Sequence, residues 1–273
     1  MCKKIRKVPG IAMILDDLAA YARERVRNDR TRISDEEMRA HALALAPSTF
    51  QFEKTLAHAG LSFICEIKHA SPSKGIIDPA FDPLTIAHAY DDARADCISC
   101  LTEPKWFLGS DEIFTSVRHE VTIPMLRKDF TVDIYQIYQA HCMGADAVLL
   151  ICAILDDDTI KRGIELCDAM GMTALVEAHD TDEIKRAVHC GARVIGVNNR
   201  DLRTFTVDSH RAAHLRDAAP DDVLFVAESG ISCAQDLIGL TDAGIDAVLV
   251  GEALMRADDK TETLHSFREA ARQ

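Results

Sequence analysis

Lysine and glutamate side chains end several short apolar runs of this sequence, where they could act as acids and bases. Glu66 and Lys68 close one such run, and Lys128 closes another. Glu177 and Glu228 end two more. An ammonium group delivers a proton to a carbonyl oxygen, and a carboxylate accepts one or stabilises positive charge. These residue types predict acid–base chemistry on a small organic substrate.

Alternation along a strand decides which of these side chains share a face, because successive side chains point to opposite faces. Each polar residue shares its face with apolar or small residues earlier in the same run. The sets are Ile64, Glu66 and Lys68; Leu126 and Lys128; Leu175 and Glu177; Val194, Gly196 and Asn198; and Val226 and Glu228. A buried unpaired charge costs several kcal/mol. The pattern therefore indicates a functional site, or alternatively a ring of structural ion pairs.

Eight short apolar runs alternate with helical patterns from about residue 60 onward. The runs start 21 to 34 residues apart, and segments such as 133–142, 156–170 and 180–190 between them have helical spacing. Eight βα units of this length fit a (β/α)8 TIM barrel. A doubly wound sheet is the competing architecture, but no Gly-x-Gly-x-x-Gly follows the first run. The runs are 63–68, 97–102, 123–128, 147–152, 173–178, 194–198, 223–228 and 247–251.

The N-terminal part has a different character and predicts a helical extension over residues 1–47, ahead of the barrel in a single domain of residues 1–273. Residues 11–30 form an amphipathic pattern, and Ser34 with Glu37 forms a capping box that opens a second helix through Leu45. Residues 1–32 carry a net charge of +5. This segment either lies over the barrel mouth and helps hold an anionic substrate, or covers apolar barrel surface as a solvated amphipathic helix.

Charge and hydropathy exclude two classes of partner. The chain of 273 residues has a formal charge of −13, which disfavours sequence-independent binding to nucleic acid. Its longest apolar run spans residues 147–155, and nine residues are too few for a transmembrane helix. We therefore expect neither a nucleic acid nor a membrane as a partner.

The nine cysteines favour a reducing compartment. Their number is odd, most lie in apolar segments, and Cys97 and Cys100 form a lone C-x-x-C without a partner pair. Buried thiols acting as small hydrophobic side chains explain this pattern best. The basic N-terminus and the apolar stretch after it resemble a signal peptide, but Pro9 and Gly10 break that stretch. We therefore expect a cytoplasmic protein.

Small residues after the last two runs predict a phosphate site. Ser229 and Gly230 follow the seventh run and lead through Ile231 and Ser232 into a helix, and Gly251 with Glu252 follows the eighth. The loops at these two positions are the usual phosphate site of a (β/α)8 barrel, because small residues let backbone N–H groups approach an anion. A divalent metal held by Glu66, Glu177, His179 and Glu228 is the weaker alternative, since two lysines would compete for the carboxylates.

Seven segments at these strand ends closely resemble, in order, the motifs of indole-3-glycerol phosphate synthases. They include Glu-Ile-Lys-His-Ala-Ser-Pro-Ser-Lys-Gly at 66–75, Arg-Lys-Asp-Phe at 127–130 and Ala-Glu-Ser-Gly at 227–230. The others are 101–107, 175–177, 196–202 and 250–252. The resemblance runs through essentially the whole chain and leaves no second domain, so it points to the monofunctional form.

The resemblance implies conversion of 1-(2-carboxyphenylamino)-1-deoxyribulose 5-phosphate to indole-3-glycerol phosphate, CO2 and water in tryptophan biosynthesis, without cofactor or metal. It assigns Lys128 as general acid on the substrate carbonyl. Glu177 would act as general base or stabilise positive charge on the anilino nitrogen, and Glu66 with Lys68 would form a second acid–base and anion-binding pair. Other enzymes of tryptophan synthesis would be the potential partners.

The resemblance also assigns the residues that bind the substrate. The residues implied to orient the substrate are Ser71, Phe107 at the anthranilate ring, Asn198, Arg200 and Glu228, and Asn198 is also counted as catalytic. The residues implied to hold the phosphate are Ser229, Gly230, Gly251 and Glu252. Three positions depart from the family pattern. His69 replaces a common lysine, Trp106 replaces a smaller aromatic residue, and Glu252 stands where a serine often lies. Phosphate contact at Glu252 would then come from its backbone N–H.

Three other functions are compatible with parts of the pattern. Lys68 or Lys128 could form a Schiff base with a sugar-phosphate ketone, as in a lyase. Another phosphate-binding barrel, such as phosphoribosylanthranilate isomerase, would not need both lysines together with Glu177. A non-catalytic scaffold would have no reason to keep costly buried charges.

Overall fold

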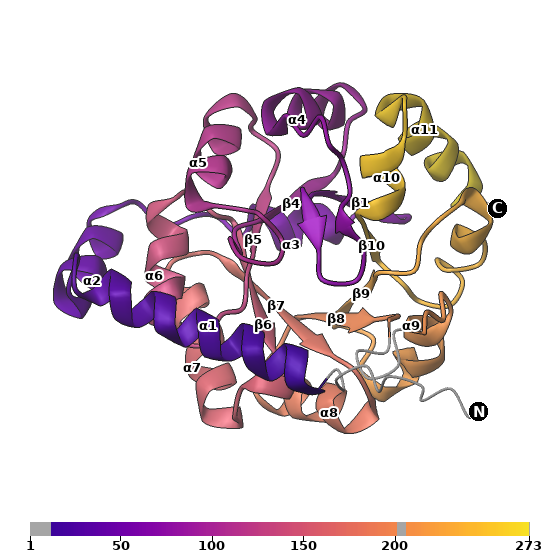
Figure 1. The fold of residues 1–273 in the computed structure, drawn as a ribbon. Helices are drawn as coiled ribbons and strands as arrows, with labels where there is room; N and C mark the ends of the chain where they lie inside the picture. The colour runs from indigo at the N-terminus through magenta and orange to yellow at the C-terminus, as the bar shows by residue number, and fades with distance from the viewer. Residues whose placement is uncertain (1–11, 201–205, 273) are drawn as a thin grey trace, which may run out of the picture.

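The computed structural model describes residues 12–200 and 206–272, and these form a closed barrel of parallel strands (Figure 1). The barrel order is β1-β10-β9-β8-β7-β6-β5-β4, so each strand pairs with its neighbours in sequence and the ring closes between β1 and β10. Each strand lies within two residues of a predicted run, and the predicted (β/α)8 architecture is confirmed. The strands are β1 (Ser62–Ile67), β4 (Cys97–Leu101), β5 (Met125–Lys128), β6 (Ala147–Ile151), β7 (Thr173–Ala178), β8 (Val194–Asn198), β9 (Leu224–Glu228) and β10 (Ala247–Val250).

Helices surround the barrel (Figure 1). They are α4 (Pro83–Asp92), α5 (Asp111–Glu120), α6 (Tyr135–Cys142), α7 (Asp157–Ala169), α8 (Thr181–His189), α9 (Arg211–Leu215), α10 (Glu252–Arg256) and α11 (Lys260–Ala270), with short 3₁₀ helices η1 (Cys152–Ile154), η2 (Arg216–Ala218) and η3 (Ala234–Leu237). Side-chain oxygens of Ser110, Asp156 and Asp180 accept N–H groups in the first turns of α5, α7 and α8 and so fix where these helices begin. The helix expected after Ser232 is only the short η3, where the Asp236 carboxylate accepts the Ser232 and Cys233 N–H groups.

The strands are buried on both faces, which explains their continuous apolar runs. Ile64, Leu126 and Leu175 belong to a cluster inside the barrel, while alternate strand residues pack outward against the helices. The bottom of this inner cluster is completed by Phe52 and Leu56, both fully buried, from the short helix α3 (Gln51–Leu56). Sequence analysis did not predict α3, because six residues are too few to show helical periodicity.

The N-terminal extension consists of α1 (Ala12–Arg30) and α2 (Asp35–Ala44), and the predicted capping box of Ser34 and Glu37 is confirmed. Helix α1 runs across the face of the barrel that carries the site, whereas α2 packs against α6 (Figure 1). Val26 of α1, Met38 of α2 and Tyr135 of α6 share a buried cluster that joins the three helices. Residues 1–11, with Ile11 and the basic positions 3, 4, 6 and 7, lie outside the described residues.

Gly171 fixes the segment that leads from the extension into the barrel. Its φ is +68°, and an added Cβ would overlap the carbonyl oxygen of Ser48. The Ser48 N–H donates to Met170 O, and the Phe50 N–H donates to Gly171 O, both at 2.8 Å. Close backbone approach and a left-handed conformation together require glycine here.

Gly171→Ala should therefore lower the free energy of unfolding by roughly 2–5 kcal/mol, the sum of a left-handed alanine and an overpacked contact. Gly191 provides a matched control, because its φ is +94° but a Cβ there would meet nothing within 4 Å. Gly191→Ala should lose only about 1–2 kcal/mol. Urea unfolding of both variants measures the difference, and equal losses would show that the Ser48 contact contributes nothing.

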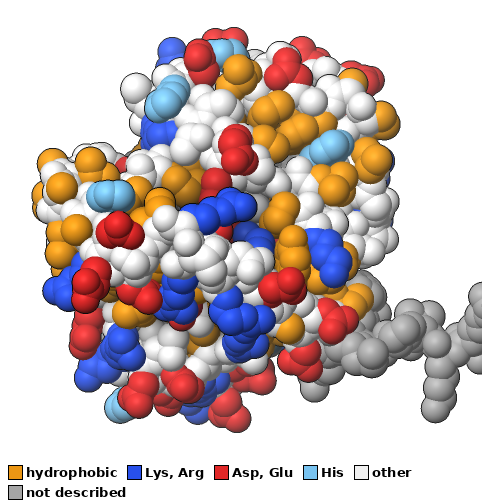
Figure 2. All heavy atoms as spheres, turned by 60° about the vertical axis from the view of Figure 1, so that its left-hand side comes forward, with side chains coloured by type: hydrophobic (Ala, Val, Ile, Leu, Met, Phe, Trp, Pro, Cys, Tyr) orange, Lys and Arg blue, Asp and Glu red, His pale blue; other side chains and the backbone are white. Residues whose placement is uncertain are grey.

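The surface gives two further observations. Within residues 12–200 and 206–272, no helix combines the length and apolar character needed to cross a membrane. Figure 2 shows acidic and basic side chains intermixed over the lower part of one face, not a continuous basic surface. Intermixed charges of both signs give no continuous positive electrostatic potential that would attract a polyanion to this face.

Candidate active site

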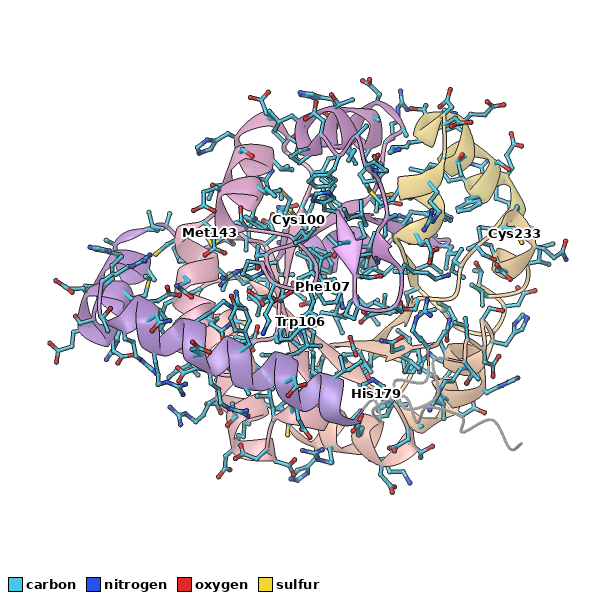
Figure 3. The ribbon with its side chains drawn as sticks, in the orientation of Figure 1. Cys100, Trp106, Phe107, Met143, His179 and Cys233 are labelled. Atoms are coloured by element: carbon cyan, nitrogen blue, oxygen red, sulfur yellow. The ribbon has the colours of Figure 1, made fainter. Side chains whose placement is uncertain are left out.

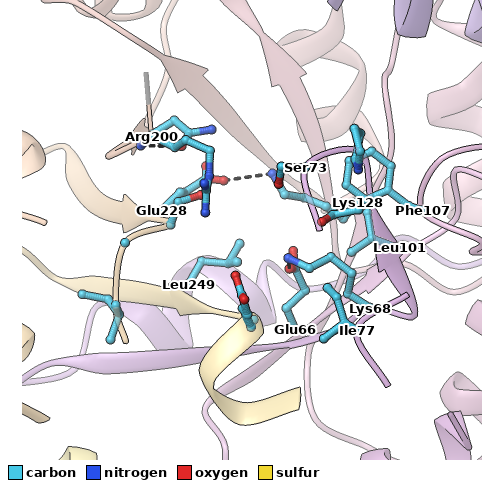
Figure 4. Close-up of a pocket in the computed structure, with 18 of the residues that line it drawn as sticks. Glu66, Lys68, Ser73, Ile77, Leu101, Phe107, Lys128, Arg200, Glu228 and Leu249 are labelled. Carbon is cyan, nitrogen blue, oxygen red and sulfur yellow. Dashed lines mark hydrogen bonds and ion pairs between the residues drawn. The ribbon is translucent and has the colours of Figure 1, made fainter. Parts of the chain in front are cut away.

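A cavity of about 780 Å³ opens at the carboxyl ends of the barrel strands. Residues from most of the βα units line it, so groups far apart in sequence face a common space (Figure 4). All thirteen residues assigned to a site from the sequence are among those that line it. They are Glu66, Lys68, Ser71, Phe107, Lys128, Glu177, Asn198, Arg200, Glu228, Ser229, Gly230, Gly251 and Glu252.

Lys128 stands between two buried carboxylates. Its Nζ lies 2.9 Å from Oε2 of Glu228 and 3.3 Å from Oε2 of Glu177. Both glutamate side chains are almost inaccessible to solvent, at 2% and 5% exposed. Gly196 leaves the space for Glu228, because a Cβ at Gly196 would overlap Oε1 of that carboxylate. This arrangement keeps a charged ammonium group at the carboxyl end of an otherwise apolar barrel interior.

A second lysine–glutamate pair lies across the cavity. The Lys68 ammonium donates to the Glu66 carboxylate, and both groups come from the end of β1 (Figure 4). Gly251 at the end of β10 faces this pair, since a Cβ there would overlap Oε1 of Glu66. Strand alternation placed these charged residues on the inner face correctly, and the structure brings the two pairs to one cavity.

Burial and the mutual charges separate the pKa values of the two carboxylates beside Lys128. Burial raises the pKa of Glu228 to about 7, although Lys128 opposes this shift. Burial also opposes ionisation of Glu177, but Lys128, His179 and Asn198 together hold the pKa of Glu177 below its ordinary value. Despite burial, Glu228 and Glu177 hold the pKa of Lys128 above that of a free lysine. Two carboxylates whose pKa values are pushed apart typically have different acid–base roles.

The raised pKa of Glu228 predicts a pH-dependent effect on stability. An unfolded glutamate titrates near 4.5, so between pH 4.5 and 7 the folded protein binds more protons at this position than the unfolded chain. The contribution of Glu228 to stability is therefore complete below pH 4.5 and is lost as the pH rises through 7.

Glu228→Gln cannot ionise and should become more stable relative to the unmodified protein as the pH rises from 5 to 8. Urea unfolding of both proteins at several pH values measures this difference. A difference that stays constant across this range would contradict the raised pKa.

The rim after β9 and β10 has the backbone conformation of an anion site. Ser229 and Gly230 both adopt left-handed conformations, with φ of 64° and 85°. Consecutive N–H groups in such turns form a concave surface that favours anions. On the opposite side, the Glu252 carboxylate pairs with Arg256 at 3.1 Å and with Lys74 at 3.4 Å. Because Arg256 and Lys74 pair with the Glu252 carboxylate, the backbone N–H of Glu252 is the group suited to contact an anion.

Aromatic and apolar side chains form the remaining wall. Phe107 and Phe130 lie 6.1 Å apart between ring centroids, and Leu18 of α1 lines the same cavity. Trp106 packs edge-on against Tyr21 of α1 at 5.5 Å and does not line the cavity (Figure 3). Of the two neighbouring aromatic residues, therefore, Phe107 faces the cavity and Trp106 anchors the extension.

Sequence analysis missed several members of this wall. Phe130 belongs to the Arg-Lys-Asp-Phe segment, and its place two residues after Lys128 was a usable signal. Ile14, Leu15 and Leu18 belong to the segment 11–30, which was predicted only as an amphipathic helix, but they also line the cavity. Helical periodicity identifies an apolar face without showing what it covers. The last two residues of segment 196–202 lie outside the described residues.

A partly buried ion pair joins the extension to the residue beside Lys128. Two guanidinium nitrogens of Arg25 donate to the Asp129 carboxylate at 2.5 and 3.0 Å. Burial would raise the pKa of Asp129, but Arg25 and Arg127 hold it below its ordinary value. Arg127 is itself fixed by Asp111, at 2.9 Å. This contact connects α1 directly to the end of β5.

Arg25→Met should destabilise the protein by roughly 3–5 kcal/mol, because it leaves the Asp129 charge buried with a poorer partner. It should also raise KM, since α1 carries part of the cavity wall. Arg27 is exposed on the same helix, so Arg27→Met is the matched control and should be nearly neutral. Thermal unfolding and steady-state kinetics test the pair, and equal behaviour of the two variants would contradict this role for the Arg25–Asp129 contact.

Comparison with known proteins is consistent with this geometry. Residues 15–267 match the family model described as indole-3-glycerol phosphate synthase. The chain is 50% identical over 260 residues to the indole-3-glycerol phosphate synthase of Ruminiclostridium cellulolyticum, covering 95% of this chain and all of the relative. The corresponding enzyme of Lachnoclostridium phytofermentans is 43% identical over 268 residues, covering 94% and 99%.

Among solved structures, a 3-hexulose-6-phosphate synthase superposes with a TM-score of 0.61 at 17% identity, covering 77% of this chain and 99% of that one. At this identity the similarity concerns the barrel fold alone.

Proposed function

Because the chain belongs to the indole-3-glycerol phosphate synthase family, we propose that the thirteen cavity residues form its active site. The enzyme closes the ring of 1-(2-carboxyphenylamino)-1-deoxyribulose 5-phosphate with loss of CO2 and water, giving indole-3-glycerol phosphate in tryptophan biosynthesis. The observation that carries the assignment of residues is Lys128, held between Glu177 and Glu228 in the cavity that also contains the glycine-rich rim.

The substrate would span the cavity from the rim to the aromatic wall. Its phosphate is proposed to bind the backbone of Ser229, Gly230, Gly251 and Glu252, where left-handed turns and small residues allow close approach. Its carboxyphenyl ring would pack against Phe107, with Phe130 beside it. Ser71, Asn198 and Arg200 would orient the polar atoms between these ends. This placement directs the ketone oxygen towards Lys128.

Ring closure is the step assigned to Lys128. The ring carbon that bears the carboxylate attacks the ketone carbon, and the ketone oxygen takes a proton from the Lys128 ammonium as the new bond forms. Positive charge then lies on the ring and its nitrogen, where the ionised Glu177 stabilises it. The bond to the carboxylate breaks next, CO2 leaves, and the electron pair restores the aromatic ring.

Dehydration is the step assigned to Lys68 and Glu66. The new hydroxyl leaves as water after taking a proton from Lys68, and the carbon next to nitrogen gives its proton to Glu66. These two groups already share a hydrogen bond and lie across the cavity from Lys128. All of these steps are proton transfers and carbon-bond changes that side chains can serve, so we propose neither an organic cofactor nor a metal ion.

We further propose that the chain works as one domain in the cytoplasm. Residues 1–47 would form the extension and residues from about 60 the barrel, and the Arg25–Asp129 contact supports joint folding. Eight described cysteines are free thiols, which is typical of a reducing compartment. The substrate and product are small molecules of tryptophan synthesis, so other enzymes of that pathway are the partners we would examine first.

The activity itself is tested on the purified chain. Incubation with 1-(2-carboxyphenylamino)-1-deoxyribulose 5-phosphate should yield indole fluorescence together with one CO2 per product. Borohydride added during turnover separates acid–base catalysis from a Schiff-base route. An active enzyme without a covalent adduct supports the proposed roles, whereas a trapped adduct on Lys68 or Lys128 would replace them.

A further inference from the structure

His179 lies next to the active-site residue Glu177, one residue beyond the end of β7 (Figure 3). It does not line the cavity, and its side chain is only 15% exposed. Its Nε2 is buried and makes no hydrogen bond within residues 12–200 and 206–272. That nitrogen nevertheless lies 3.4 Å from Oε1 of Glu177, the oxygen that does not contact Lys128. A buried polar atom aimed at a catalytic carboxylate calls for an explanation.

The rest of the imidazole is held firmly. Nδ1 lies 3.1 Å from Oε2 of Glu183, which also accepts the backbone N–H of His179 at 2.8 Å. The carbonyl oxygen of His179 accepts a hydrogen bond from Arg211 at 2.7 Å. Glu183 of α8 therefore holds the ring, Arg211 of α9 holds the backbone of His179, and the remaining ring nitrogen lies beside Glu177.

The two carboxylates beside Lys128 differ in what their far oxygens meet. Oε1 of Glu177 faces Nδ2 of Asn198 at 3.4 Å as well as His179. Oε1 of Glu228 is buried and has no hydrogen-bond partner among the described residues. Lys128 alone cannot explain why the pKa of Glu177 is lowered and that of Glu228 is raised, because Lys128 contacts both carboxylates.

We propose that His179 is a positioning residue of the active site, which with Asn198 holds one oxygen of Glu177 so that the other faces Lys128 and the reacting atoms. The inference rests on the proposed role of Glu177. A donor on the far oxygen also keeps that carboxylate ionised, which stabilising positive charge on the substrate requires.

Charged groups from several elements set the protonation of His179. Glu183 on α8 and Glu177 on β7 contact the ring, and Glu228 on β9 acts from further away. Arg211 on α9 donates to the backbone carbonyl of His179. Lys128 on β5 lies beyond Glu177. Burial lowers the pKa of His179, but Glu183 and Glu177 raise it above its ordinary value. A raised pKa favours the protonated imidazole, whose Nε2 lies 3.4 Å from Oε1 of Glu177.

The first test compares two substitutions at His179. His179→Leu removes the donor and should lower kcat roughly 10- to 100-fold while KM stays within about threefold, because misplacing a catalytic group affects the reacting step. The acidic limb of the kcat profile should move to higher pH as Glu177 loses a donor. His179→Gln keeps an N–H donor and should recover most of the loss. Unchanged kcat and pH profile in folded His179→Leu would overturn the proposal.

The second test does not depend on turnover. NMR titration of the His179 ring, assigned with His179→Gln, should give a pKa above 6.5 that falls in Glu177→Gln and in Glu183→Gln. If it does not fall in Glu177→Gln, the contact does not exist and the proposal fails. If the contact is found but the purified chain makes no indole-3-glycerol phosphate, the proposed function fails instead. This titration also decides the matter should His179→Leu not fold.

Discussion

Lys128→Met is expected to lower kcat by at least ~100-fold, the lower scale for removing a general acid. Methionine has similar length and flexibility but no proton to deliver to the ketone oxygen. The substrate should still bind, because its phosphate and ring are assigned to other parts of the cavity. The loss should therefore appear in kcat and not in KM.

Folding should survive this substitution for a specific electrostatic reason. Removing an ammonium from between two buried carboxylates would ordinarily destabilise a protein strongly. Glu228, however, already has a pKa of about 7, and without Lys128 that pKa rises further, so the carboxyl takes up a proton. Steady-state kinetics and thermal unfolding test both statements, with Lys161→Met on the exposed face of α7 as a control. Near-normal turnover would remove Lys128 from the role of general acid.

Glu177→Gln should also reduce kcat by about 100-fold. The substitution keeps the size and shape of the side chain but removes the negative charge next to the substrate nitrogen. Because Glu177 helps to raise the pKa of Lys128, the substitution should also lower the pKa of Lys128. The expected result is a fall in kcat with KM nearly unchanged.

The measurement is steady-state kinetics across a pH range, with Glu165→Gln on the surface of α7 as the matched control. An effect confined to KM would assign Glu177 to substrate binding alone. The same variant serves the test of His179, since loss of the Glu177 charge should lower the pKa of His179.

Strand alternation predicted most of the charged cluster because it is a local rule. Lys128 and Glu228 each lie two residues after a buried apolar residue, and this alone placed them on the inner face of the barrel. The barrel closes because eight similar βα units repeat along the chain, and repetition is visible in sequence. These features could be predicted because each depends on a few neighbouring residues.

Contacts between distant segments were not predictable in the same way. Arg25 and Asp129 are 104 residues apart, and nothing in either neighbourhood identifies the other as its partner. The interpretation of the basic extension was left between two alternatives, and its role in holding an anionic substrate stays a prediction, because α1 lines the cavity with apolar residues only. It covers apolar surface and also lines the cavity with Leu18. His179 was considered only as a metal ligand, because its contact with Glu177 depends on how β7 ends and α8 begins.

The most direct test of the central claim is a crystal structure of the enzyme with a substrate analogue whose ketone is reduced to an alcohol. Such a molecule keeps the phosphate, the carboxyphenyl ring and the oxygen to be protonated, but it cannot close the ring. The account predicts Lys128 Nζ within hydrogen-bond distance of that oxygen, the phosphate on the backbone of Ser229, Gly230 and Gly251, and the ring against Phe107. An analogue bound with its oxygen away from Lys128, or with its phosphate elsewhere, would contradict it.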